Sequence, residues 1–215
     1  QPFLENTKKR QSAIFGWVDK KFVSNIENYK KYKWLEGNSP KIWRQGVKHD
    51  LSKVMVLHYD QKGILLNSNG EKVDMEPRFL YPFLKSSDLQ VKIAQKSRFE
   101  LIITQQKLGA DTKILEETAP KLWDYLNQNL DKFNARKSRI YNNKLLFSIF
   151  GIGDYTFKPF KIGVSGFYKK LNFCLIKTQD DKPVILDDTS YYLFFDKLMD
   201  AFFTWVFLNF PEVKE

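Results

Sequence analysis

The side chains best suited to chemistry gather in one basic and aromatic segment, residues 136–170. This segment contains eight Lys or Arg residues, eight Phe or Tyr residues and one acid, Asp154. Cations neutralise phosphates and release counterions, while aromatic faces stack on bases or pack beneath cations. The glycines of the segment allow close approach to a ligand or to another backbone. The alternative interpretation is a pair of aromatic core strands with solvated lysines between them.

The charge of the whole chain points the same way. There are 35 Lys and Arg residues against 25 Asp and Glu residues, which gives a formal net charge of +10. Residues 1–53 contribute twelve basic and five acidic side chains to this imbalance. Such an excess is typical of nucleic-acid-binding proteins, although membrane surfaces and acidic proteins attract the same charge.

Length and composition limit the classes of protein that fit. A chain of 215 residues with 43% hydrophobic residues forms one large domain or two small ones. The single cysteine, Cys174, excludes an internal disulfide and fits a reducing, cytoplasmic compartment. No apolar run reaches the roughly 18 residues of a membrane span, and no signal peptide is visible. Because the chain begins with Gln, we expect a fragment of a longer protein.

Sequence patterns predict short strands and two clear helices. The predicted strands and turns are strands at 54–59, 99–104, 147–150, 160–165, 173–176 and 184–186, and hairpin turns at 61–63 and 68–70. Pro82 is expected to bar a regular strand or helix within 79–89. One helix should begin with Thr118 as N-cap and Pro120 in its first turn, and bury Leu122, Leu126, Leu130 and Phe133. A second should run over 191–208 after an N-cap cluster at 187–190. Residues 1–35 show no clear period.

Two other patterns do not favour a cofactor or metal site. The glycines of Gly151-Ile152-Gly153 lead into a segment that starts no helix cleanly, unlike a phosphate-binding loop. His49 and His58 lack metal-ligand spacing with Cys174, so we expect surface or hydrogen-bonded histidines.

Six strings in order resemble one family. They are SPKIWRQGVKHDLSKVMVL, FLYPFLKSSDL, TAPKLWDYL, RKSRIY, FSIFGIGDYTFKPFKIGVSGFYKK and KPVILDDTSYYL. Together they are similar to the C-terminal target-recognition region of adenine-specific DNA methyltransferases of bacterial restriction–modification systems, in particular those with a Taq-like specificity domain. The resemblance covers about residues 14–210.

The resemblance implies an α+β fold, with a mixed irregular sheet and flanking helices, and a single recognition domain over 1–215. It implies double-stranded DNA as partner. The family's Asn/Asp-Pro-Pro-Tyr/Phe tetrapeptide and its strand–glycine–helix site for S-adenosylmethionine are missing from this sequence. The resemblance therefore implies that this chain is non-catalytic and binds no cofactor. Methyl transfer and S-adenosylmethionine would belong to an N-terminal catalytic domain of the parent enzyme.

The residues expected to contact DNA come from three of these motifs. They are Arg136, Lys137, Ser138, Arg139 and Tyr141; Tyr155, Lys158 and Lys161; Arg44, Gln45, Lys48 and His49; and Lys169. Arginines pair bidentately with guanine edges or phosphates, glutamine can read adenine, and lysines bind phosphates.

Two other functions remain open at this stage. The chain could be a DNA endonuclease domain of a restriction enzyme, which requires converging acids and a divalent metal. It could also be an adaptor whose basic face binds an acidic protein. Duplex binding that falls steeply with salt would favour DNA over a protein partner.

Overall fold

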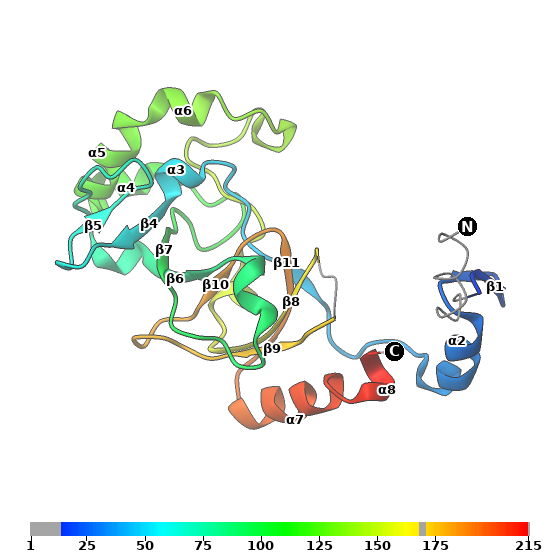
Figure 1. Ribbon diagram of the computed structural model, residues 1–215. Helices are drawn as coiled ribbons and strands as arrows, with labels where there is room; N and C mark the ends of the chain where they lie inside the picture. Colours follow the sequence, from blue (N-terminus) through cyan, green and yellow to red (C-terminus); the bar gives the residue numbers. More distant parts are fainter. Residues whose placement is uncertain (1–13, 168–170, 215) are drawn as a thin grey trace, which may run out of the picture. The chain divides into compact units, whose positions relative to one another are not determined.

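The computed structural model describes residues 14–167 and 171–214 (Figure 1). The chain divides into two units. One comprises residues 1–40 and 210–215, and the other residues 41–209. The fold is α+β with irregular sheets, as the sequence predicted. The expectation of a single recognition domain over 1–215 stays a prediction.

In the smaller unit, an antiparallel hairpin joins β1 (Gly16–Val18) to β2 (Lys21–Val23) and precedes α2 (Ile26–Tyr32) and η2 (Lys33–Leu35). Asp19 and Lys20 have φ of 46° and 70°, as a two-residue hairpin turn requires. The Asn25 side chain accepts a hydrogen bond from the Asn28 amide and caps α2. Sequence periodicity missed these elements because they are short. The unit also contains α8 (Pro211–Lys214).

The larger unit contains two sheets. The five-stranded sheet has the order β10-β6-β7-β4-β5, and its strands are β4 (Val56–Tyr59), β5 (Leu65–Leu66), β6 (Leu80–Leu84), β7 (Phe99–Ile102) and β10 (Ile185–Leu186). Only the β10–β6 pair is parallel among these. The four-stranded antiparallel sheet has the order β3-β11-β8-β9, with β3 (Arg44–Gln45), β8 (Phe160–Ser165), β9 (Cys174–Ile176) and β11 (Ser190–Phe195).

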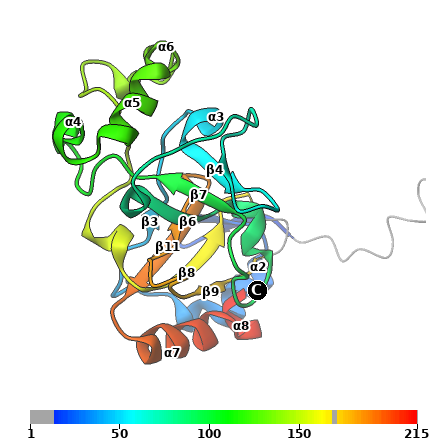
Figure 2. The same ribbon diagram turned by 90° about the vertical axis from the view of Figure 1, so that its left-hand side faces the viewer.

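Helices cover opposite ends of this unit (Figures 1 and 2). The five-stranded sheet shares its core with α3 (Ser52–Met55), α4 (Leu115–Thr118), α5 (Pro120–Gln128) and α6 (Leu130–Asn134). The four-stranded sheet packs against α7 (Leu198–Leu208), whose Ala201 is buried. Five 3₁₀ turns complete the described elements of the unit: η3 (Pro77–Phe79), η4 (Ser86–Gln90), η5 (Thr112–Ile114), η6 (Arg139–Tyr141) and η7 (Asp154–Phe157). None of the described helices combines the length and apolar character needed to cross a membrane.

Several predicted elements are confirmed. β8 spans the predicted residues, and β7, β9 and β10 fall within their predicted ranges. Pro120 occupies the first turn of α5, and Leu122, Leu126 and Phe133 are buried. Gly63 and Gly70 have φ of 76° and 79° in the predicted turns. Cys174 is buried.

Other predicted elements are wrong. The helix expected over 191–208 begins only at Leu198, because Ser190–Phe195 pair with all of β8. The expected N-cap cluster instead forms a turn in which Asp187 accepts hydrogen bonds from the Thr189 and Ser190 hydroxyls. Residues 147–150 make no strand, since Phe147 has φ of 62° and only Phe150 forms a bridge.

Three smaller errors concern element boundaries. Pro82 lies inside β6, where β10 pairs only with Phe83 and Leu84, so one side of Pro82 needs no ladder hydrogen bond. Ala119, not Thr118, is the N-cap of α5, and the Thr118 hydroxyl donates to Ile114 O. The strand expected from Val54 begins at Val56, after α3.

Candidate nucleic-acid interface

Two glycines bring three of the sequence motifs side by side. A Cβ on Gly46 would lie 2.0 Å from Asp187 O, and a Cβ on Gly151 would lie 2.4 Å from Gly46 O. Gly151 also has φ of 69°, which favours glycine. Lys48 and Phe150 exchange backbone hydrogen bonds, each with an N···O distance of 2.9 Å. The motifs around residues 44–50, 150–161 and 187–190 therefore meet through backbone contacts that larger residues would prevent.

Arg136 connects the backbone contacts at Gly46 and Gly151, which we call the glycine crossing, to helix α6. Its Nη1 donates to Ser148 O at 2.8 Å and to His49 O at 3.5 Å, and its Nε donates to Phe133 O at 3.2 Å. The guanidinium lies 3.7 Å from the centroid of the Tyr141 ring, and burial lowers the pKa of Arg136. The sequence predicted both side chains as DNA contacts. The structure instead occupies this arginine with the chain's own carbonyls and covers one face of the tyrosine.

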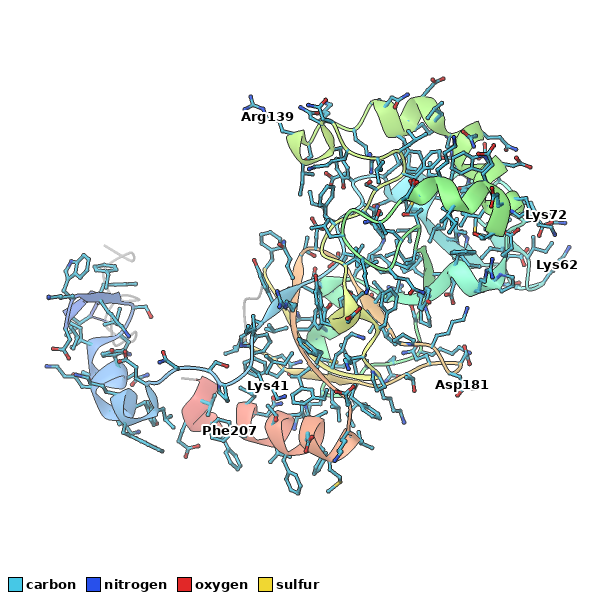
Figure 3. All side chains as sticks on the ribbon, turned by 180° about the vertical axis from the view of Figure 1, so that it is seen from behind. Lys41, Lys62, Lys72, Arg139, Asp181 and Phe207 are labelled. Atoms are coloured by element: carbon cyan, nitrogen blue, oxygen red, sulfur yellow. The ribbon has the colours of Figure 1, made fainter. Side chains whose placement is uncertain are left out.

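The segment between Arg136 and Phe147 projects as an exposed loop. We call residues 137–146 the basic loop. Its exposed residues include Lys137, Arg139 and Lys144, together with Ile140, Leu145 and Leu146. Figure 3 shows the Arg139 side chain extending outward. Among the described residues, no hydrogen bond or ion pair engages the three cationic side chains, and Ser138 is half-buried beside them. These cations are positioned to contact a partner.

The C-terminal end of the basic loop is anchored by Phe147. This side chain is fully buried, with ring centroids 5.4 Å from Trp123 and 4.9 Å from Phe133. Its carbonyl accepts a hydrogen bond from the Thr104 hydroxyl at 2.8 Å. A positive φ is unusual for a bulky residue and persists only where packing enforces it. With Arg136 at one end and Phe147 at the other, the loop is held in place.

A second loop, residues 105–109, lies beside the basic loop and was missed by the sequence analysis. Between them is a pocket of about 350 Å³, whose lining includes Gln105, Leu108, Lys144 and Phe150. Gln105 Nε2 donates to Lys107 O within this loop and to Ile149 O, just after the basic loop. Lys107 and Leu108 are exposed. The only sequence signal was a polar stretch ending in Gly109, whose φ is 77°.

The polar side chains of residues 44–49 mainly bind other groups of the chain itself. Gln45 is exposed, but its Nε2 donates to Asp188 O at 2.6 Å. Lys48 Nζ pairs with Asp50 at 2.6 Å and Asp188 at 3.2 Å, and the hydrogen bond to Asp50 raises the pKa of Lys48. His49 is buried, accepts from Leu51 N through Nδ1, and burial lowers the pKa of His49 to about 4. Of these four expected DNA contacts, Gln45 is the exposed one, and its contact with DNA stays a prediction.

The third group of expected contacts is also largely internal. The Arg44 guanidinium lies 4.8 Å from the centroid of the half-buried Tyr155 ring. Lys158 pairs with Asp196 at 2.6 Å. Lys161 is buried, where its Nζ donates to Lys158 O at 2.7 Å and burial lowers the pKa of Lys161 to about 7. Lys161 was expected to contact DNA, but it lies on a covered face of β8 and its side chain is buried.

Lys169 lies outside the described residues, so its predicted DNA contact stays a prediction. Of the expected DNA contacts that the structure describes, Gln45, Lys137 and Arg139 are the exposed ones. The candidate interface is therefore centred on the basic loop and the adjoining 105–109 loop.

The described residues were also tested as a site for a metal or cofactor. No group of three His, Cys, Asp or Glu among them could hold a metal ion. The glycine segment at 151–153 does not fit a cofactor loop, because the Gly46 backbone fills the space beside Gly151 and only the short η7 follows.

Comparison with known proteins identifies a relative. No family model matches the chain. Over 208 residues, 96% of its length, the chain is 40% identical to the Type II methyltransferase M.NspV of Nostoc sp. (strain ATCC 29411 / PCC 7524). This chain is a homologue of part of a Type II methyltransferase. The match covers 43% of the relative, so the chain spans less than half of that protein's length.

Proposed function

We propose that this chain is the sequence-specific double-stranded DNA recognition module of an adenine-specific DNA methyltransferase in a restriction–modification system. The observation that carries the proposal is the 40% identity to a Type II methyltransferase over 208 residues. An enzyme that methylates DNA at defined sites must bind the duplex and read its sequence. The six motifs that resemble target-recognition regions support the assignment of this role to the matching part.

The geometry supports one surface for this role. The basic loop presents Lys137, Arg139 and Lys144 from a segment held at both ends by buried residues. Cations supply the phosphate contacts that dominate affinity, and an arginine on such a loop can read a guanine edge. On this proposal Arg136 and Lys161, whose donors bind carbonyls of the chain itself, support the fold behind the contact surface.

Catalysis and cofactor binding belong, on this proposal, to the part of the methyltransferase outside this chain. The parent enzyme would use S-adenosylmethionine as methyl donor. In the chain itself, the glycine segment that most resembles a cofactor loop is filled by backbone. No step of methyl transfer is therefore assigned to its residues. The endonuclease alternative gains no support from the comparison, whose match is a methyltransferase.

A salt titration of duplex binding tests the proposal. The chain alone should bind duplex DNA with a dissociation constant of about 10⁻⁶–10⁻⁴ M, as nonspecific binding does. The test variant is Lys137→Ala with Arg139→Ala. The matched control is Lys62→Ala with Lys72→Ala, two exposed lysines that lie away from Arg139 (Figure 3). Each double variant lowers the net charge from +10 by two, to +8.

The expected result is a difference in salt dependence at equal charge. Losing two phosphate contacts should reduce the slope of log K against log salt by about 2, since each contributes about 0.9. The control should keep the original slope to within about 0.5. Failure of the unmodified chain to bind any duplex at low salt, in fluorescence anisotropy, would contradict a DNA-recognition role. Equal loss in both variants would remove the basic loop as its site.

A further inference from the structure

Helix α7 is apolar around most of its circumference. Within Leu198–Leu208, the polar residues are Asp200 and Thr204. One side packs on the four-stranded sheet: Ala201 is buried, and Trp205 Nε1 donates to Phe173 O at 2.9 Å. A surface helix normally has one apolar stripe and a polar face opposite. A helix whose apolar surface extends well beyond one stripe is normally buried, so the exposed apolar side of α7 requires an explanation.

Five large apolar side chains of α7 are exposed, the last of them being Phe207 at 50%. We call the other four the α7 patch: Leu198, Met199, Phe202 and Phe203, with exposed fractions of 45%, 57%, 41% and 63%. Met199 and Phe203 are four residues apart and share a face of the helix. Contiguous exposed apolar residues of this size mark interaction sites in soluble proteins.

The chemistry of the patch excludes DNA as its partner. Asp200 is the sole charged residue within α7, and the exposed Lys197 at its N-cap is a single cation, far fewer than a phosphate backbone attracts. The nearby Asp196 is already paired with Lys158. An interfacial membrane helix would carry Lys or Arg on a polar face, which α7 lacks. Figures 1 and 2 place α7 at the opposite end of its unit from α5 and α6. The patch therefore fits an apolar protein surface away from the basic loop.

We propose that the α7 patch docks onto the part of the same methyltransferase that lies outside this chain. The proposal rests on the proposed function, because it takes this chain as one module of a longer enzyme. The chain matches only 43% of its relative, so more than half of that polypeptide is available as a covalently linked partner. Linkage in one chain gives a high effective concentration, so a patch of four side chains suffices for docking. An obligate dimer normally uses a much larger interface.

Thiol labelling provides a direct test, because the chain has a single native cysteine. Cys174 is buried and burial raises its pKa to about 12, so it gives little background. Phe203→Cys places a thiol in the patch. Ile114→Cys is the control, at a side chain with a similar exposed fraction of 59%. Labelling rates with a maleimide are compared between the 215-residue chain and the full-length methyltransferase that contains it.

We expect the thiol at position 203 to be labelled at least tenfold more slowly in the full-length enzyme, with no change at position 114. Equal rates at 203 in the two proteins would overturn the proposal, as would an equal slowing at both positions. Slow labelling of the isolated chain that depends on protein concentration would assign the patch to a second copy. Slow labelling relieved by deleting residues 1–13 would assign it to the chain's own N-terminus. Either result overturns docking to the rest of the enzyme.

A second variant separates this proposal from the proposed function. Phe203→Glu should leave the urea midpoint and the DNA affinity of the 215-residue chain unchanged, because the side chain is exposed and distant from the basic loop. In the full-length enzyme it should split one thermal unfolding transition into two. An unsplit transition in Phe203→Glu would contradict docking through the patch. If the unmodified chain fails to bind DNA while the thiol of Phe203→Cys is still protected in the full-length enzyme, the proposed function alone would be contradicted.

Discussion

Two groups of cations from the same stretch of sequence have different surroundings. Arg136 and Lys161 are held by carbonyl groups of the protein, and burial lowers the pKa of each. Lys137 and Arg139 lie between them in sequence and are exposed on the basic loop. We call Arg136 and Lys161 the inner cations, which stabilise the fold. We call Lys137 and Arg139 the outer cations, which are available to a partner. A count of basic residues along the sequence therefore overestimates how many of them are available for binding.

This division has a physical basis in the cost of burial. A buried cation needs hydrogen-bond acceptors, whereas an exposed one is solvated by water. Arg136 follows α6, where the carbonyl of Phe133 and that of Ser148 supply acceptors. Cations are also favoured at helix C-termini. Among the described residues, no acceptor binds Lys137, Arg139 or Lys144 of the basic loop, and these side chains are exposed to solvent.

The sharpest test of this division is the stability of arginine variants. Arg136→Met keeps side-chain bulk but removes the donors to Phe133 O and Ser148 O. It should lower the free energy of unfolding by about 3 kcal/mol, because bonds to charged groups contribute about 1.5–3 kcal/mol and a carbonyl is left unpaired. Arg139→Met, the matched control, should change it by less than about 0.5 kcal/mol. Urea denaturation measures both values.

Equal destabilisation by the two methionine variants would remove the distinction between inner and outer arginines. A smaller loss for Arg136→Lys than for Arg136→Met is also expected. Lysine can still donate to one carbonyl, although it cannot reproduce the fork of the guanidinium.

Lys161 gives the second test, through pH. Burial lowers its pKa from 10.5 to about 7 in the folded chain. Between these values the unfolded chain keeps a proton that the folded chain has released, so stability must rise with pH. The expected gain is about 1.5 kcal/mol between pH 7 and 8.5, since one pKa unit corresponds to about 1.4 kcal/mol. Above pH 9 the raised pKa of buried Cys174 makes stability fall with pH, because the folded chain keeps a thiol proton that the unfolded chain releases.

The matched variant is Lys161→Met, which removes the titrating group and preserves most of the side chain. Its free energy of unfolding should lack the gain of about 1.5 kcal/mol that the unmodified chain shows over the same pH window. A parallel pH profile for both proteins would show that Lys161 is hydrated and belongs with the outer cations.

The sequence predicted those parts of the fold that depend on local signals. Pro120 marks the start of α5, and Gly63 and Gly70 mark turns, because backbone geometry restricts these positions directly. The aromatic run before Leu198 was assigned to a helix, since its spacing suits a helical stripe as well as a strand. Pairing with β8, a partner some thirty residues away, decides the outcome. Propensity yields to such tertiary contacts.

The candidate site was predicted less completely, for a related reason. A residue type does not reveal which face of a strand is covered. Lys161 shares a side of β8 with Gly163, whose position is closed by Leu89 of η4 and by Ile176. That burial follows from the packing of η4 onto the sheet, which no local pattern encodes. The 105–109 loop was missed because it is brought beside the site by a long-range hydrogen bond, from Gln105 Nε2 to Ile149 O, which no local pattern encodes.

The smallest expected effect concerns the outer cations themselves. If Arg139 reads a base edge, Arg139→Ala in the full-length enzyme should cost about 1 kcal/mol of discrimination at one base position, the lower end of the range for such contacts. This lower value is expected because an exposed arginine must be ordered on binding. Lys137→Ala should weaken cognate and scrambled duplexes alike and lower the salt slope by about one. The measurement is binding of both variants to both duplexes across a salt series.

Equal weakening of the two duplexes by Arg139→Ala would mean that the basic loop only positions the DNA backbone. Base readout would then have to come from another exposed group, with Gln45 beside the glycine crossing as the next residue to replace.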